Sequence, residues 1–256
     1  MEKQATREAY GQALEALGAA NENVVVLDAD LSKSTKTNLF QKKFPERFFD
    51  MGIAEQNMMG VAAGFAATGK VPFASTFAVF ATGRAYDQIR NTICYPQLNV
   101  KIAATHAGIT VGEDGGSHQA LEDINLMRGL PNMTVLVPAD GPEAYKAVMA
   151  AAAYDGPVYI RLGRSAVPTV TDPDADFVIG KGKLLREGTD VTLIACGMMV
   201  AVALDAAELL AAEGVNAAVI DMSTIKPIDR ALICEWAEKT GAVVTAEEHN
   251  IIGGLG

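Results

Sequence analysis

The sequence has no long apolar run. No stretch reaches the roughly eighteen consecutive apolar residues that a membrane-spanning helix needs. The first ten residues, MEKQATREAY, are polar and charged, so they lack the apolar centre of a secretory signal peptide. We therefore expect a cytoplasmic protein with no membrane partner.

Cysteine is scarce as well. The three cysteines, Cys94, Cys196 and Cys234, lie far apart in the chain and do not have the spacing of a metal site. An odd number of widely separated cysteines fits reduced thiols better than a disulfide framework. We expect all three to be free, which agrees with a cytoplasmic location.

Positive charge is in deficit. The sequence has 21 Lys and Arg residues against 31 Asp and Glu residues, which gives a formal net charge of -10. Such a chain lacks the broad basic surface that binds nucleic acid or an anionic membrane. We expect no nucleic-acid partner, and we expect any phosphate binding to be confined to a small local pocket.

What the sequence does contain is a regular alternation of short β-branched runs with longer helical patterns. Half of its 256 residues are hydrophobic, which is enough to bury a substantial core. The alternation predicts an α/β fold with a parallel sheet covered by helices. It extends over residues 1–168, stops in a linker rich in Pro, Asp and Gly at 169–188, and resumes in a smaller α/β domain at 189–256. That domain ends in IIGGLG, a turn that would lead into a helix, so we expect it to be incomplete.

Polar and charged residues follow five of the predicted strands. In an open α/β sheet, ligands bind outside the carboxyl ends of the strands, so a site is expected in these loops. The densest loop, 105–119, contains His106, Asp114 and His118 among several glycines. These residue types can bind metals, but their spacing matches no metal signature. A solvated loop is the plain alternative, and we favour proton transfer or recognition of a polar substrate.

Glu55 is an isolated acid at the start of an apolar, small-residue helix, and acids at that position commonly cap the helix. Phe77 and Phe80 are three residues apart at the predicted start of the next helix, where they would share a face. Such a pair is either part of the core or a platform for a flat heterocycle. A surface or turn position is the default for the remaining candidates, although an arginine near a strand end can bind phosphate: Arg7, Ser34 and Arg164.

Taken in order and spacing, four motifs resemble the pyrimidine-binding half of transketolases: GIAEQ (52–56), TFAVF (76–80), GEDGGSHQ (112–119) and LGRS (162–165). The resemblance extends over the whole chain and includes STIKPID (223–229) in the second domain. A chain with these motifs is similar to the C-terminal subunit of the split bacterial and archaeal transketolases. That subunit consists of the pyrimidine-binding domain and the C-terminal domain.

The resemblance implies a thiamine-diphosphate-binding fold with helices on both faces of the sheet, and thiamine diphosphate bound between two chains. Glu55 would hydrogen-bond a ring nitrogen of the aminopyrimidine, on which Phe77 and Phe80 would stack. Asp30 would lie near the cofactor. Burial raises the pKa of a carboxyl group, which would let the acid share a proton. Gly83 stands where transketolases commonly have a third aromatic residue.

The same resemblance assigns the substrate side. His118 would be the second catalytic residue and would handle protons on the hydroxyl groups of the donor sugar. Asp114 would recognise the acceptor hydroxyl beside its aldehyde, and His106 would bind near the far end of the substrate. The sugar phosphate would be held by Arg7, Ser34 and Arg164.

The diphosphate and metal motif of this family, Gly-Asp-Gly followed by Asn ligands, does not occur in the sequence. The resemblance therefore implies no metal ligands in this chain and an N-terminal partner subunit that binds the diphosphate with Mg²⁺ or Ca²⁺, in an α2β2 assembly. The implied function is transketolase activity, the transfer of a two-carbon ketol unit from a ketose phosphate to an aldose phosphate. Two alternatives stay open. One is half of a 1-deoxyxylulose-5-phosphate synthase-like enzyme, whose family shares RAYDQ (84–88), and the other is a non-catalytic transketolase-like subunit.

Overall fold

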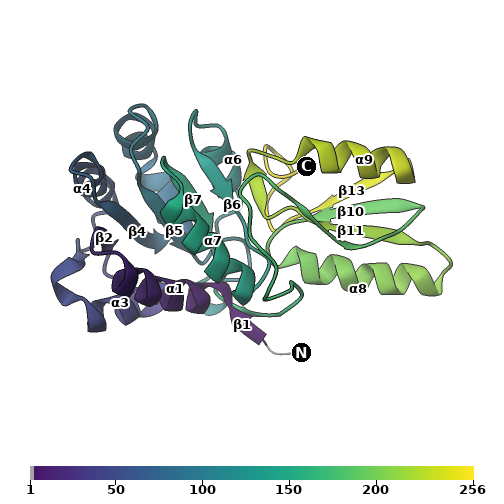
Figure 1. The fold of residues 1–256 in the computed structure, drawn as a ribbon, viewed down its shortest axis with the longest axis horizontal. Helices are drawn as coiled ribbons and strands as arrows, with labels where there is room; N and C mark the ends of the chain where they lie inside the picture. The colour runs from purple at the N-terminus through teal and green to yellow at the C-terminus, as the bar shows by residue number, and fades with distance from the viewer. Residues whose placement is uncertain (1–2) are drawn as a thin grey trace.

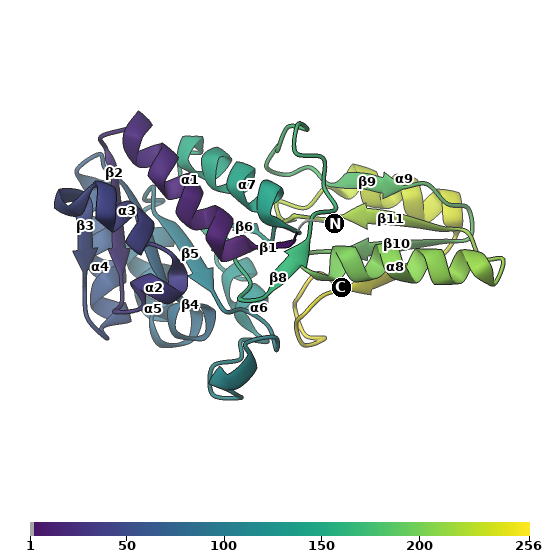
Figure 2. The same ribbon diagram turned by 90° about the horizontal axis from the view of Figure 1, so that it is seen from below.

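Two β-sheets lie end to end in the computed structural model, which describes residues 3–256 (Figures 1 and 2). The larger sheet has the strand order β12-β6-β7-β5-β4-β2-β3, and every neighbouring pair is parallel except β12 with β6. Its strands are β2 (Val24–Asp28), β3 (Phe48–Asp50), β4 (Val71–Phe77), β5 (Lys101–Thr105), β6 (Thr134–Leu136), β7 (Val158–Arg161) and β12 (Thr224–Lys226). All residues of β2 and β5, which both have a strand on either side, are buried, as expected for a parallel sheet covered on both faces.

Helices cover the two faces of the larger sheet (Figure 1). On one face lie α1 (Thr6–Ala20), α3 (Asn38–Lys43) and α7 (Gly141–Ala153), and on the other lie α4 (Glu55–Ala67) and α6 (Asp123–Arg128). The larger sheet and these helices form the larger unit of the chain. This unit also contains two short helices, α2 (Ser32–Thr35) and α5 (Tyr86–Gln88), and two π-helical turns, Phe80–Arg84 and Ile89–Cys94. The predicted α/β fold with a parallel sheet is confirmed. None of the helices between residues 3 and 256 is long and apolar enough to cross a membrane.

The smaller sheet has the order β13-β10-β11-β9, with α8 (Met199–Ala212) and α9 (Arg230–Thr240) on opposite sides (Figure 1). This sheet and its two helices form the smaller unit of the chain. Its strands are β9 (Lys183–Arg186), β10 (Val191–Ala195), β11 (Ala217–Asp221) and β13 (Val243–Ala246). The antiparallel edge strand β9 comes from the segment 169–188 that the sequence suggests as a linker. A two-stranded ribbon pairs β1 (Lys3–Ala5) with β8 (Ala166–Pro168).

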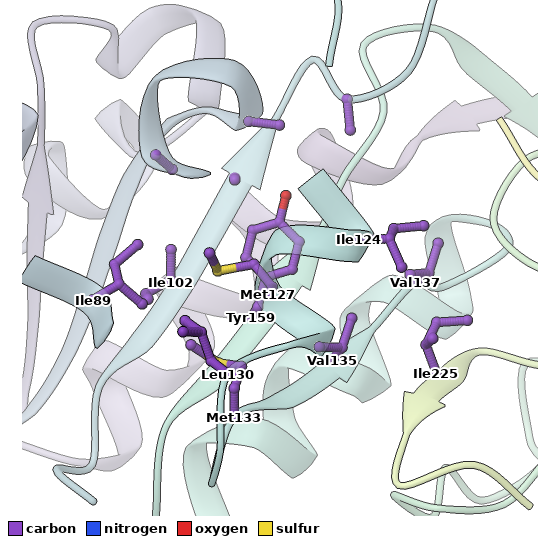
Figure 3. Close-up of a cluster of buried hydrophobic side chains, with 14 of the residues drawn as sticks. Ile89, Ile102, Ile124, Met127, Leu130, Met133, Val135, Val137, Tyr159 and Ile225 are labelled. Atoms are coloured by element: carbon purple, nitrogen blue, oxygen red, sulfur yellow. The ribbon is translucent and has the colours of Figure 1, made fainter. Parts of the chain in front are cut away.

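The two units share a hydrophobic core. Strand β12 follows β11 of the smaller unit but pairs with β6 of the larger sheet. Its Ile225 belongs to the same buried cluster as Val135 and Ile124, drawn in Figure 3. Trp236 of α9 is part of that cluster too. Because apolar side chains of both units exclude water together, the two units form one packed body.

A buried acid pair lies at this junction. Asp221, at the end of β11, is fully buried and close to Glu143 of α7, whose Oε1 is 3.6 Å from the Lys183 ammonium of β9. Burial, and then the negative charge of Glu143, raise the pKa of Asp221 well above its ordinary value. The folded chain therefore keeps a proton on Asp221 that the unfolded chain releases above about pH 4.

We expect Asp221→Asn to stabilise the protein near neutral pH. A raised folded-state pKa means that the native state binds more protons than the unfolded state, so the wild-type free energy of unfolding falls as pH rises above about 4. The uncharged amide removes that loss and should raise the free energy of unfolding by about 1–3 kcal/mol at neutral pH, measured by urea denaturation. Asp205→Asn, on the exposed side of α8, is the matched control and should have little effect. A variant with unchanged pH dependence would contradict the expectation.

Candidate active site

Glu55 is buried at the first turn of α4. Its side chain is 2% exposed, among the buried residues Met58, Met59 and Ala62 of the same helix. Both carboxylate oxygens accept hydrogen bonds from Nη1 of Arg84, at 2.8 and 2.9 Å, rather than capping the helix. The acid therefore faces a cation from a separate element.

Four rings form an aromatic cluster beside β4. Phe77 is the last residue of β4 and Phe80 begins the following π-helical turn, so the two do not share one helix as the spacing predicts. Their rings are nevertheless nearly parallel, with centroids 5.9 Å apart at an interplanar angle of 11°. The ring of His106 stacks on Phe77 at 3.8 Å, and His118 meets Phe77 and Phe80 edge-on at 6.0 and 5.4 Å. The turn after β4 thus brings together side chains from two loops.

His106 is a neutral member of the aromatic cluster. Its side chain is buried, its backbone has a positive φ of 59°, and its Nδ1 lies 2.9 Å from the Thr105 hydroxyl. Burial, and then the positive charges of Arg7 and Arg164, lower the pKa of His106 to about 3. The imidazole is therefore uncharged near neutral pH and can act there only through neutral hydrogen bonds and stacking.

Two arginines meet next to the aromatic cluster. Arg7 donates from Nη1 to the Ser34 carbonyl at 2.8 Å, and from Nε to the Arg164 carbonyl at 3.2 Å. Arg164 contacts Glu113 through Nη2 at 2.5 Å and has its Nε 3.5 Å from Asp114 Oδ2. Burial, and then the charge of Arg164, lower the pKa of Arg7. Because two cations destabilise each other, an anion bound here would be favoured.

The carboxyl end of β2 has a different set of contacts. Asp30 is exposed, has a φ of +61°, and its amide donates to Asp50 Oδ1 at 3.2 Å, so it joins the ends of β2 and β3. The scaffold beneath it is Asp28, which accepts hydrogen bonds from the hydroxyls of Thr35 and Thr37 at 2.7 and 2.8 Å. Burial raises the pKa of Asp28 to about 6 despite these bonds.

The histidine loop has protein partners rather than the arrangement of a metal site. Among residues 3–256, no three His, Cys, Asp or Glu side chains are grouped so that they could hold a metal ion. His106 and His118 contact Phe77, and Asp114 lies near Arg164. The two histidines thus share a neighbour, Phe77, and Asp114 has a different one, Arg164.

Two residues that organise the site were not predicted from the sequence. Arg84 donates to Glu55 and its guanidinium carbon lies 4.7 Å from the centroid of the Phe80 ring. The spacing of four residues between Phe80 and Arg84, within a helical turn, was the available signal. The Oε1 atom of Glu248, in the smaller unit, accepts hydrogen bonds from the backbone amides of Ile109 and Thr110 at 2.8 and 2.7 Å. These bonds anchor the histidine loop, residues 105–119. No local pattern connects residues so far apart in the chain.

Both units match known domain families. Residues 2–170 match the pyrimidine-binding domain of transketolase, and residues 180–256 match the transketolase C-terminal domain. The chain belongs to the transketolase family. The predicted resemblance to the C-terminal part of a split transketolase is confirmed by both matches and by similar proteins of known family.

A protein of Methanocaldococcus jannaschii named a transketolase C-terminal section is 54% identical, over 98% of this chain and 79% of its own length. A 6-deoxy-6-sulfo-D-fructose transketolase subunit of Clostridium sp. is 44% identical over 100% of this chain and 80% of its own. Human transketolase is 43% identical over 100% of this chain but only 41% of its own length. Among solved structures, a split-gene transketolase described as an inactive beta4 tetramer superposes with a TM-score of 0.93 at 64% identity, covering 99% of this chain and 83% of that one.

Proposed function

We propose that this chain is the subunit of a split transketolase that binds the aminopyrimidine end of thiamine diphosphate and, with a partner subunit, transfers a two-carbon ketol unit from a ketose phosphate to an aldose phosphate. The observation that supports this most directly is the buried carboxylate of Glu55 beside the parallel rings of Phe77 and Phe80. Thiamine diphosphate, when bound, supplies an electron sink for carbanion chemistry.

The residues present fit the aminopyrimidine of this cofactor. A flat, nitrogen-rich group already lies in this place, because the Arg84 guanidinium donates to Glu55 while it stacks on Phe80. An aminopyrimidine can make the same two contacts, one through a ring nitrogen and one through its face. Glu55 would hold that ring nitrogen, and the apolar residues of α4 would exclude water from the hydrogen bond.

His118 is the side chain best placed to move protons on the substrate. It is half-buried in the aromatic cluster, and its Nδ1 lies 3.0 Å from the Ser117 hydroxyl. That pairing leaves Nε2 for a hydroxyl group of the donor sugar. His106, being neutral and stacked on Phe77, would orient the substrate through hydrogen bonds without adding charge.

Arg7 and Arg164 would bind the terminal anion of the sugar. Burial, and then the charge of Arg164, lower the pKa of Arg7, and a dianion near both guanidiniums would offset their repulsion. Ser34 contributes its backbone carbonyl to Arg7, while Asp114 beside Arg164 would face the acceptor hydroxyl. A sulfonate would satisfy the same pair, and the clostridial relative is named for a sulfonated ketose. Asp30 would lie towards the cofactor from the end of β2.

The remainder of the cofactor site would come from an N-terminal partner subunit with the diphosphate and the Mg²⁺ or Ca²⁺ ion, in an α2β2 assembly. This chain spans 41% of the length of human transketolase, and the split-gene relative is described as an inactive beta4 tetramer. Both facts favour a complex of two kinds of chain. We propose that this complex works in the pentose phosphate reactions of the cytoplasm.

Reconstitution tests this function. We expect the chain alone to show no turnover, and the chain co-expressed with a subunit that contains the diphosphate-binding domain to transfer ketol units when thiamine diphosphate and magnesium are added. Donor and acceptor pairs to compare are xylulose 5-phosphate with ribose 5-phosphate, 6-deoxy-6-sulfofructose with glyceraldehyde 3-phosphate, and pyruvate with glyceraldehyde 3-phosphate. Turnover of the pyruvate pair alone would assign the synthase-like alternative instead. Normal turnover by the chain alone would contradict the split arrangement.

A further inference from the structure

The guanidinium of Arg84 makes two contacts at once. Its Nη1 lies between the two carboxylate oxygens of Glu55, at 2.8 and 2.9 Å, and its central carbon lies 4.7 Å from the centre of the Phe80 ring. These are the hydrogen-bonding and stacking partners that the proposed function assigns to the aminopyrimidine. One carboxylate edge and one ring face cannot accommodate two flat groups in the same place.

Arg84 is also free to leave this position. Its side chain is 48% exposed, whereas that of Glu55 is 2% exposed, so the arginine can turn outward without repacking the core. The preceding residue is Gly83, and a methyl group added there would meet no atom of residues 3–256 within 4 Å. The space beside Arg84 at this position is therefore open.

Arg84 has a physical role as long as no cofactor is bound. A buried carboxylate without a partner is strongly destabilising, and a cation with good geometry compensates for the lost hydration. The face of Phe80 is covered at the same time by a cation–π contact. The unloaded pocket thus keeps its acid satisfied and its ring covered.

We propose that Arg84 is an internal occupant of the pyrimidine pocket: it holds Glu55 and Phe80 in the unloaded chain and is displaced when the aminopyrimidine of the cofactor binds. This inference rests on the proposed function. Only the fraction of molecules in which Arg84 has moved away can accept the ring, so the apparent affinity for the cofactor is lowered by that fraction. Arg84 is a positioning residue that sets the affinity of the site.

The test is the affinity of the reconstituted complex for thiamine diphosphate, measured by isothermal titration calorimetry in magnesium buffer. Arg84→Met keeps the apolar stem and removes the competing guanidinium, and we expect it to bind the cofactor about tenfold more tightly than wild type. Arg84→Gln, with a smaller flat amide, should lie between the two. Arg90→Met removes the same charge from an arginine of the next π-helical turn that pairs with Asp87, and it should bind as wild type does.

The outcomes separate this inference from the function. If wild type binds and Arg84→Met binds equally or more weakly, the inference is overturned while the proposed function stands. If the wild-type complex does not bind thiamine diphosphate, both fail.

A second measurement uses the chain without its partner: Arg84→Met should lower the Tm, and adding Glu55→Gln should restore most of the loss, because the buried charge is then gone. Additive losses of Tm in the double variant would show that the two side chains do not act as a pair and would also overturn the inference.

Discussion

Glu55→Gln should lower ketol transfer by the reconstituted complex about 10²–10⁴-fold, the range expected when a proton-transferring side chain is removed. Glutamine has nearly the same shape as glutamate and can still hydrogen-bond a ring nitrogen, but it cannot take up or release a proton. The buried position of Glu55 keeps water from replacing it, since its side chain is 2% exposed. The rate constant kcat, measured with saturating cofactor, reports the loss.

The Tm of Glu55→Gln shows whether a loss of kcat comes from lost chemistry or from lost stability. The amide is uncharged, so Arg84 loses a charged partner but Glu55→Gln leaves no buried charge behind, and the Tm should change little. Glu238→Gln, an exposed position of α9, is the matched control and should keep the wild-type kcat. A Glu55→Gln complex that binds thiamine diphosphate and turns over at the wild-type rate would disprove the assigned role.

Arg161→Met should cost about 3–5 kcal/mol of unfolding free energy, because it leaves a buried carboxylate without its partner. Arg161 ends β7 and is buried against Asp123 of α6, with Nε 2.7 Å from Oδ2 and Nη2 3.1 Å from Oδ1. Tyr159 donates a further hydrogen bond to Asp123 at 2.8 Å. Burial alone would lower the pKa of Arg161, but the contact with Asp123 outweighs it and raises that pKa.

The same arginine joins the two units and positions the histidine loop. Its Nη2 also donates to the carbonyls of Ala120, at 3.3 Å, and Glu248, at 2.8 Å. We therefore expect Arg161→Met to reduce ketol transfer as well, although Arg161 contacts neither Glu55 nor the aromatic cluster in the described chain.

Urea denaturation of the single and double variants measures this effect. Replacing both partners, as Arg161→Met with Asp123→Leu, removes the unpaired charge and should recover most of the lost stability. Arg186→Met is a control, because Arg186 pairs with an exposed glutamate at the edge of the smaller sheet and should contribute less than about 1 kcal/mol. A loss from Arg161→Met as small as that of the control would contradict the importance of the buried pair.

The fold could be predicted because its signals are local. The predicted alternation of short β-branched runs with helical patterns became the parallel strands of the two sheets and the helices around them, since a buried parallel strand needs a short β-branched run whatever its neighbours are. The position of the candidate site followed from the same pattern, because loops after parallel strands meet at one edge of the sheet. The structure does bring Phe77, His106 and His118 together there.

Local signals were less reliable for side-chain direction. A spacing of three residues predicts that Phe77 and Phe80 share a helix face, but Phe77 belongs to β4 and the rings align only because the chain turns between them. Glu55 does lie in the first turn of α4, but its hydrogen bonds come from Arg84 and not from the amides of its own helix. A cap is a contact within one element, and Arg84, 29 residues further along the chain, is the stronger hydrogen-bond donor.

The sequence by itself determined the parallel α/β architecture and the residue types that line its carboxyl edge, since hydrophobic periodicity and turn chemistry act over a few residues. Only the tertiary structure decided that Glu55 faces Arg84, that Arg7 and Arg164 lie close enough to repel each other, and that Glu248 anchors the histidine loop. Charges and hydrogen bonds act through space, over distances that the fold brings to a few ångströms between residues far apart in the chain. Their partners become visible only when the chain has folded.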